Sequence, residues 1–232
     1  MFFSQAISDA GIITFDPTES RHCLKVLRKR PGDTLEVTDG KGMIYQCRLL
    51  DENLSGCHLT IEKGEQGKDV RENTLHIAVS PLKNPSRFEW FLEKATETGI
   101  GEITPLICHR TEKQHFKPER FQNLLISAMK QSGRSLLPRL NQPVKFRDII
   151  TDTTEAGKYI AWCGTDPKPL LKDLIRKGES ALILIGPEGD FTAEEVEQAT
   201  GRGFFAVSLG DARLRTETAA LAACFTFNLV NL

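Results

Sequence analysis

Two stretches near the C-terminus decide the fold: residues 185–191 read IGPEGDF, and residues 209–220 read LGDARLRTETAA. Each is a glycine-bearing turn that follows an apolar strand and leads into a helix. Such turns let a ligand approach bare main chain beside a helix N-terminus, which is where open α/β sheets place their binding crevice. The sequence therefore predicts a ligand-binding α/β domain in the C-terminal half.

The two turns do not match the common nucleotide-binding motifs. Neither has the glycine and Lys-Ser/Thr spacing of a phosphate-binding loop, and neither has the Gly-x-Gly-x-x-Gly pattern of a dinucleotide fold. An ordinary nucleotide-binding domain is therefore disfavoured.

From residue 74 onward, apolar strands alternate with amphipathic helices, which predicts a mostly parallel sheet with helices on both faces. The expected strands are 75–79, 103–108, 159–163, 181–185 and 205–209. Capping boxes are expected at 86–89 and 192–195, and the first of these helices should end at Gly99. The final helix, 217–230, is apolar nearly all round, so we expect a second subunit to cover it in a homodimer.

Residues 1–67 read as a small β-rich unit with one helix. The expected strands are 2–7, 11–15, 34–38, 43–50 and 56–61, with a hairpin turn at Asp39-Gly40. Residues 16–19 (DPTE) offer an N-cap, a first-turn proline and a capping-box glutamate. Because 65–69 is polar and turn-rich, we place a boundary there, between domains at 1–67 and 73–232.

The composition is that of an ordinary soluble globule, with 232 residues of which 40% are hydrophobic and 26% charged. No apolar run approaches the ~20 residues of a membrane-spanning helix, and the N-terminus lacks a secretion signal, so a cytoplasmic location is expected. The six cysteines form no C-x-x-C pair and the five histidines no ligand pattern. We therefore expect free, mostly buried thiols and no metal site.

The charges are unevenly placed although the net charge is only −1. Residues 21–30 hold five Lys/Arg and no acid, and residues 110–147 hold nine Lys/Arg against Glu112 and Glu119. A charge run can be a solvated face of a helix or strand. Two separate basic blocks in one chain favour a polyanionic partner.

Several motifs resemble one known family. They are HCLKVLR at 22–28 with PGD at 31–33, Lys83, Arg87, KATE at 94–97, QSGR at 131–134, and the two C-terminal turns. Together they resemble the RsmE type of the SPOUT methyltransferases over most of the chain. Three positions depart from the family pattern: Thr98 stands in place of leucine, Lys130 in place of a small or acidic residue, and Asp190 in place of a second glycine.

The resemblance implies a PUA-like β-barrel that binds RNA, followed by a SPOUT domain whose last segments form a deep knot around S-adenosylmethionine. It implies methylation of N3 of a uridine in the 16S ribosomal RNA, within the assembled small subunit. Rival readings are a SPOUT enzyme for another ribosomal or transfer RNA position, and a non-catalytic RNA-binding or ribosome-assembly protein. The modified nucleotide and the substrate's assembly state do not follow from the sequence.

The resemblance also assigns residues to the site. The expected cofactor-binding residues are Ile185, Gly186, Pro187, Glu188, Gly189, Ser208, Leu209, Gly210, Leu214, Thr216, Thr218 and Ala219. The expected RNA-binding residues are Arg21, His22, Lys25, Arg28, Lys29, Arg30, Lys83 and Arg87.

Uracil N3 is a weak acid, so the enzyme must remove its proton or stabilise the anion on the flanking carbonyl oxygens. Arg215 is expected to donate to such an oxygen, and Glu217 to accept the proton. Glu188 competes for the role of base, Glu217 can equally be a helix-dipole partner, and Arg215 can equally pair with an acid. Arg134, the third expected catalytic residue, can contact an anion or serve the dipole of its own helix.

Overall fold

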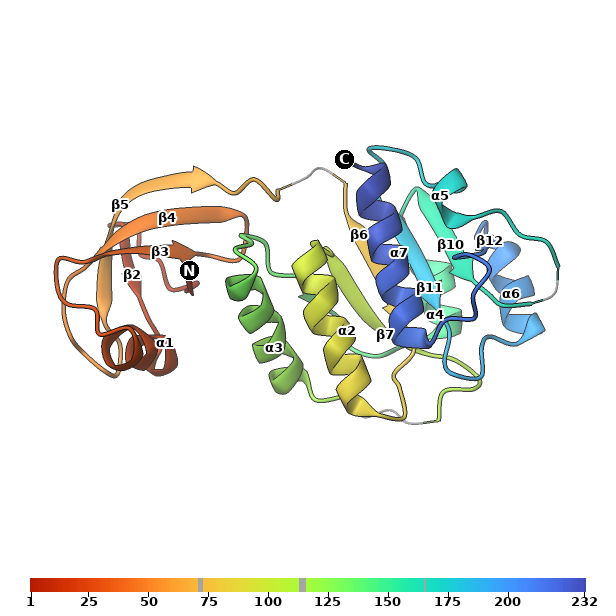
Figure 1. Cartoon of the computed structure of the whole chain (residues 1–232), viewed down its shortest axis with the longest axis horizontal. Coiled ribbons are helices and arrows are strands. Elements are labelled where there is room, and N and C mark those ends of the chain that lie inside the picture. The colour runs from red at the N-terminus through yellow and green to blue at the C-terminus, as the bar shows by residue number, and fades with distance from the viewer. Residues whose placement is uncertain (71–72, 113–115, 165) are drawn as a thin grey trace. The chain divides into compact units, whose positions relative to one another are not determined.

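The computed structural model describes residues 1–70, 73–112, 116–164 and 166–232 (Figure 1). The predicted basic residue Lys113 and the predicted non-ligand His115 therefore lie outside the described residues. The chain divides into two compact units. The first comprises residues 1–70 together with 126–137, and the second comprises the remaining described residues.

The first unit is built on a curled, mostly antiparallel sheet with strand order β1-β3-β4-β5-β2 (Figure 1). Its strands are β1 (Phe2–Phe3), β2 (Ile12–Thr14), β3 (Thr34–Thr38), β4 (Met43–Leu49) and β5 (His58–Gln66). Alternate residues such as Leu35 and Val37 point into an apolar core that also holds Phe15 and Cys47. This sheet confirms the expected small β-rich unit. The pairing of Met43 with Gln66 extends β5 into the segment that we expected to be a turn.

The helix of this unit begins at the predicted N-cap, Asp16, but lacks one half of the predicted capping box. In α1 (Pro17–Arg21), the Asp16 side chain accepts hydrogen bonds from the Thr18 and Glu19 amides, both at 2.7 Å. The expected return contact from Glu19 is absent among the described residues, because its buried carboxylate is ion-paired with Lys130. The chain then continues as a single π-helical turn, His22–Val26.

The chain returns to the first unit at the end of α3 (Pro118–Gln131). Thr38 Oγ1 and the Gly42 amide donate to the Ser135 carbonyl oxygen at 3.1 and 3.0 Å, and the Leu137 amide donates to the Gly40 carbonyl oxygen at 2.9 Å. Residues 126–137 are thus bonded to the β3 to β4 connection. The predicted boundary at 67–73 does not include this second passage of the chain.

The second unit contains a parallel sheet with strand order β12-β10-β11-β6-β7-β8, and β9 pairs with β7. The strands are β6 (Leu75–Val79), β7 (Glu102–Ile107), β8 (Arg139–Leu140), β9 (Val144–Lys145), β10 (Gly157–Ala161), β11 (Ala181–Ile185) and β12 (Phe205–Val207). The central strands β6 and β11 are buried throughout, as parallel strands covered on both faces must be.

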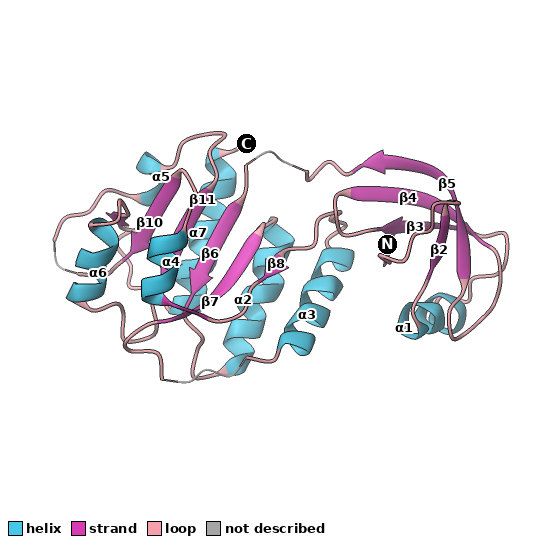
Figure 2. Cartoon of the chain, turned by 180° about the vertical axis from the view of Figure 1, so that it is seen from behind, coloured by secondary structure: helices cyan, strands magenta, loops and turns pink. Residues whose placement is uncertain are grey.

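Helices cover both faces of this sheet, which confirms the predicted fold class (Figure 2). On one face α7 (Thr216–Val230) contacts α2 (Pro85–Thr98), β6 and β11, and short α5 (Leu171–Leu174) also packs on α7. On the other face, the strands share a core cluster with α4 (Phe146–Asp152) and α6 (Ala193–Thr200). The knot implied by the resemblance stays a prediction.

Helix ends in this unit show where local sequence signals compete. The capping box at Thr192 and Glu195 is present as predicted, and Gly99 closes α2 with φ 88°. The capping box predicted at Ser86 is wrong. Asn84 caps α2 and Pro85 stands in its first turn, so the helix is capped two residues earlier than predicted, because these two strong start signals outweigh the weaker one at Ser86. None of the helices in the described ranges is long and apolar enough to cross a bilayer.

Candidate functional site

A pocket of about 1050 Å³ opens in the second unit beyond the carboxyl ends of β10, β11 and β12. Three connections form its described walls, at residues 161–168 after β10, 185–191 after β11 and 207–216 after β12, with Thr165 outside the described residues. Arg110, Ala193 and Ala219 complete the lining. In open parallel sheets this edge is the usual place for a ligand crevice.

The turn after β11 brings main chain to the pocket, and glycine is needed at position 186 because a side chain would have no room there. A Cβ on buried Gly186 would meet the Phe191 ring at 3.1 Å. The carbonyl oxygen of Gly186 accepts a hydrogen bond from Thr216 Oγ1 at 3.1 Å, which fixes the turn against the start of α7. Arg110 Nη1 donates to the Gly189 carbonyl oxygen at 2.6 Å and so braces the outer part of the turn.

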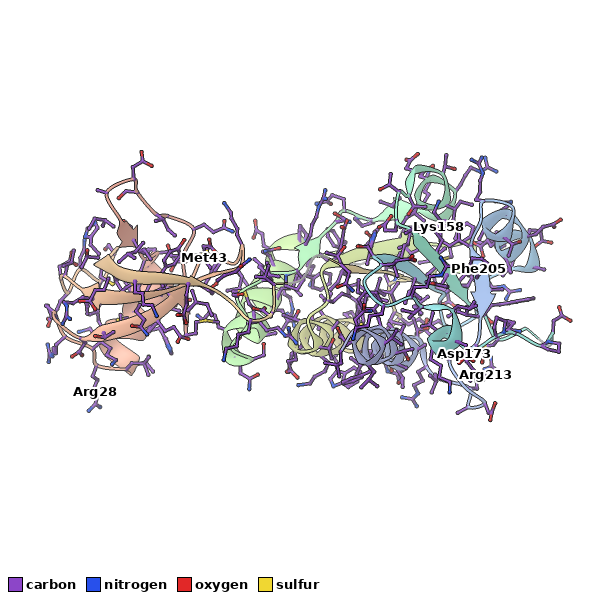
Figure 3. The ribbon with its side chains drawn as sticks, turned by 90° about the horizontal axis from the view of Figure 1, so that it is seen from above. Arg28, Met43, Lys158, Asp173, Phe205 and Arg213 are labelled. Atoms are coloured by element: carbon purple, nitrogen blue, oxygen red, sulfur yellow. The ribbon has the colours of Figure 1, made fainter. Side chains whose placement is uncertain are left out.

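The turn after β12 leads directly into α7. Gly210 has φ 126°, a conformation that side-chain-bearing residues rarely adopt, and its amide donates to Ser208 Oγ at 3.2 Å. Arg215 is the N-cap residue of α7 and is exposed at the pocket rim, and Arg213 on the same loop is also exposed. Figure 3 shows Arg213 in this outer loop. The N-terminus of α7 therefore lies at the pocket, where its dipole favours negative charge.

Most of the predicted cofactor-binding residues line this pocket. They are Ile185, Gly186, Pro187, Glu188, Gly189, Ser208, Leu209, Gly210, Leu214, Thr216 and Ala219. Thr218 is exposed on α7 and is outside the lining.

Sequence reasoning missed the wall formed after β10 by Trp162, Cys163, Gly164, Asp166 and Lys168. The Lys168 ammonium donates to the carbonyl oxygens of Gly164 and Asp166 at 2.5 and 2.7 Å and lies 5.0 Å from the Trp162 ring centroid. The rule that parallel strands end at one edge of the sheet could have pointed to this segment.

The three predicted catalytic residues differ in their surroundings. Arg215 lines the pocket. Glu217 does not: its carboxylate is buried, with Oε1 3.7 Å from Arg87 Nε, and Oε2 has no hydrogen-bond partner among the described residues. Arg134 belongs to the first unit, where its Nη1 lies 4.0 Å from an Asp69 carboxylate oxygen. The proposed roles of all three stay predictions.

The predicted RNA-binding residues fall into two groups. On the first unit, Arg21, His22, Lys25, Arg28 and Arg30 are exposed and Lys29 is half-buried. Figure 3 shows the Arg28 side chain pointing away from the ribbon. On the second unit, Lys83 is exposed and its ion pair with Glu112 at 2.7 Å raises its pKa, while Arg87 is half-buried beside Glu217.

The cysteines are free, and all but Cys163 are buried, as predicted. Burial raises the pKa of Cys23 and of Cys224 to about 12, and that of Cys47 to about 11. These thiols are protonated at neutral pH and are poor nucleophiles. Within the described ranges, no group of His, Cys, Asp and Glu side chains has an arrangement that could hold a metal ion.

Two family models match the chain. A model of an RNA methyltransferase domain matches residues 70–228, and a model of an RNA methyltransferase PUA domain matches residues 15–62. Two curated relatives are each named ribosomal RNA small subunit methyltransferase E. The protein from Synechocystis sp. is 29% identical over 222 residues, which are 93% of this chain and 72% of the relative. The protein from Bacillus subtilis is 28% identical over 234 residues, 94% of this chain and 90% of the relative.

Solved structures resemble the whole chain. A probable rRNA methyltransferase from Porphyromonas gingivalis is 34% identical with a TM-score of 0.92, and the match covers 99% of this chain and 97% of that one. A ribosomal RNA small subunit methyltransferase E from Neisseria gonorrhoeae, solved bound to S-adenosyl methionine, is 29% identical with a TM-score of 0.87 and the same coverage. The resemblance drawn from the sequence motifs is confirmed. The chain belongs to the RNA methyltransferase domain family.

Proposed function

We propose that this chain is an S-adenosylmethionine-dependent methyltransferase that modifies N3 of a uridine in the 16S RNA of the small ribosomal subunit. The observation that carries the proposal is the pocket built from the two glycine turns beside the start of α7. A relative of nearly the same length and fold was solved with S-adenosyl methionine. The second unit then supplies the reaction site, and the first unit supplies contacts to RNA.

The residues present fit this cofactor. Gly186 and Gly210 expose main chain to a ligand, Leu209 gives the lining an apolar part, and the acids Glu188 and Asp211 favour a cation. When bound, S-adenosylmethionine supplies a methyl group on a positively charged sulfur that is open to nucleophilic attack. No metal and no nucleophilic side chain are required, because the protein's main task is to align the two reactants.

We assign Arg215 the role of stabilising the attacking base. Its exposed guanidinium at the pocket rim can donate to a uracil carbonyl oxygen as negative charge spreads from N3. Glu188 is exposed in the same lining and is accessible to a docked base, whereas Glu217 is buried outside it. This difference favours Glu188 as the proton acceptor and leaves Glu217 to pair with Arg87.

The choice between the two acids is testable by substitution. We expect Glu188→Gln to lower the single-turnover rate on the order of 10²-fold, because the amide cannot accept the proton from N3. We expect Glu217→Gln to lower the thermal midpoint while the rate at saturating cofactor and RNA stays within a few-fold. The reverse pattern would assign the base to Glu217.

Two measurements test the proposed function itself. Calorimetry of the full chain with S-adenosylmethionine separates an enzyme from an RNA-binding or ribosome-assembly protein that lacks activity. Mass spectrometry of RNA from a deletion strain should show one methyluridine missing from the 16S RNA. If the missing methyl group is in another RNA, a related enzyme with a different target is the correct assignment.

We further propose that the protein works as a homodimer in the cytoplasm on the assembled small subunit. One face of α7 leaves Phe225 and Leu229 exposed at 52% and 67%, and Leu232 follows at 78%. An apolar surface of this kind usually meets a partner. Light scattering at micromolar concentration should give twice the chain mass, and Leu229→Glu should give a monomer. A fully active monomeric wild-type protein would rule out this part of the proposal.

A further inference from the structure

Asp190 has an unusual main-chain conformation in the wall of the pocket. Its φ is 62°, in the left-handed region that favours glycine, although it carries a side chain. The resemblance also leads one to expect glycine at this position. A residue held in this region has a conformational cost, and the cost persists only where the surrounding contacts compensate for it.

The Asp190 carboxylate makes two contacts of different kinds. Oδ1 accepts a hydrogen bond from the Phe191 amide at 2.8 Å, which stabilises its own turn. Oδ2 accepts a hydrogen bond from the Cys163 amide at 3.0 Å, which joins the turn after β11 to the segment after β10. Both are bonds to an ionised acceptor, which are stronger than those between neutral groups.

The hydrogen bond from the Cys163 amide to Asp190 lies between two other hydrogen bonds that hold the segment after β10. Before it, the Trp162 amide donates to the Val207 carbonyl oxygen at 3.3 Å, and after it the Ser208 amide donates to the Pro169 carbonyl oxygen at 2.9 Å. Between these points, the hydrogen bonds that Lys168 makes to described residues go to carbonyl oxygens of its own segment, those of Gly164 and Asp166. Asp190 therefore ties the described part of this segment to the turn after β11.

We infer that Asp190 is a positioning residue that preforms the cofactor pocket by holding residues 162–164 as part of its wall. The inference rests on the proposed function, because it assigns the pocket to S-adenosylmethionine. A preformed wall lowers the ordering cost that binding must otherwise meet, so it acts on cofactor affinity. Asp190 does not touch the reacting atoms in this role, and the chemical step at saturating cofactor is independent of it.

The decisive variant is Asp190→Gly in the full chain. It removes both contacts and at the same time relieves the left-handed strain, so stability and affinity should separate. We expect the thermal midpoint to stay within about 4 °C of wild type, the scale of one small change in a chain of this length. We expect the dissociation constant for S-adenosylmethionine to rise about tenfold, the scale of removing one charge-assisted hydrogen bond. The single-turnover rate at saturating cofactor should stay within twofold.

Two further variants control for charge and for conformation. Asp190→Asn keeps a residue that tolerates the left-handed region but offers one acceptor oxygen for two amides, so an intermediate rise of roughly threefold is expected. Asp173→Asn removes the same charge from an exposed position on α5 that is outside the pocket lining (Figure 3). Its affinity for the cofactor should equal that of wild type.

Hydrogen exchange of the Cys163 amide without cofactor tests the tie directly. We expect this amide to be protected in the wild type and to exchange faster in Asp190→Gly. Unchanged affinity in Asp190→Gly, or a loss of affinity that only follows a large fall in thermal midpoint, would overturn the inference. A wild-type protein that binds no S-adenosylmethionine would overturn the proposed function as well, and is thereby distinguishable.

Discussion

The two basic blocks of the sequence differ in what their side chains contact. In the second block, between residues 110 and 147, five of the described bases contact a carboxylate or a carbonyl oxygen. They are Arg110, Arg120, Lys130, Arg134 and Arg139. In each case the partner belongs to the same unit as the base. In the first block, residues 21–30, the described residues show one ion pair, from Arg30 to Glu52, and most of the bases are exposed.

The bases of such a run can therefore be paired within their own unit, as Lys130 is with Glu19, or can be exposed charges, as Arg28 is. Residue counts alone do not separate the two, because the acids that neutralise a paired base lie far away in sequence, as Glu19 does from Lys130. The first block is therefore the better candidate for binding RNA. Substitutions in both blocks and at the pocket test this contrast.

Arg215 should give the largest effect, because it is an exposed base at the pocket rim and not part of either block. Arg215→Lys should lower the single-turnover methylation rate roughly 10²-fold, about 2.7 kcal/mol, by removing one preorganised donor to a developing anion. Cofactor affinity should change little. Arg202→Lys, an exposed position beyond α6, serves as the control. A changed melting temperature with a normal methylation rate would show that Arg215 has a structural role, such as pairing with an acid, and does not assist the reaction.

Gly210→Val tests whether the pocket depends on bare main chain. A β-branched residue cannot adopt φ 126° without strain of about 2 kcal/mol, so the dissociation constant for S-adenosylmethionine should rise about 30-fold. Gly203 has φ 87° and open space around it but lies outside the pocket, so Gly203→Val is a matched control for strain. Equal cofactor affinities in the two variants would contradict the assignment of the turn.

Lys130→Met tests whether a basic residue of the second block stabilises the fold through its ion pair. It leaves the buried Glu19 carboxylate without its cation, and since the Lys130 side chain is only 22% exposed we expect a loss of about 2 kcal/mol in the free energy of unfolding. Denaturant titration measures it. The double variant Glu19→Gln with Lys130→Met should recover most of the loss. Equal stability of Lys130→Met and wild type would mean that the pair contributes nothing.

Arg28→Ala with Arg30→Ala tests the first block against the second. The double variant should weaken RNA binding about tenfold, and the slope of log affinity against log salt should fall by roughly 0.7 to 0.9 for each RNA phosphate that is no longer neutralised. The matched double variant Arg120→Ala with Arg139→Ala, from the second block, should leave the slope unchanged. The contrast fails if both double variants change the slope equally.

We expect the smallest effect from Glu155→Gln, which tests by its pH dependence how much a buried hydrogen-bonded pair contributes to the free energy of unfolding. A hydrogen bond from His76 Nδ1 at 2.8 Å holds the pKa of Glu155 at about 2. A lowered pKa in the folded state stabilises the protein above the unfolded value near 4.5, and this contribution is lost as pH falls toward 2. Glu155→Gln should therefore lower the unfolding free energy by about 1 kcal/mol at pH 7 and flatten its pH dependence between about 4.5 and 2. Parallel pH curves for the two proteins would contradict the role of this pair.

The sequence predicted some elements to the residue and missed others for physical reasons. The ranges 75–79 and 181–185 match β6 and β11, because apolar runs bounded by polar residues, interrupted in β6 by His76, mark buried parallel strands. β10 begins and ends two residues earlier than predicted, since Trp162 and Cys163 continue the apolar run but line the pocket. The two glycine turns of the site were predictable from local spacing. The third wall depends on strand order, which no local pattern contains.

The return of residues 126–137 to the first unit has a consequence for how this chain can be cut or recombined. A protease that nicks the chain between residues 67 and 73 would separate the sheet of the first unit from its own helical end, which stays covalently attached to the other half. A chain that begins at Asn73 would carry Ser135 and Lys130 without the β3 to β4 connection and the Glu19 that they bond to. The two units are therefore not freely exchangeable modules, and a recombination event that swaps one must carry both of its segments.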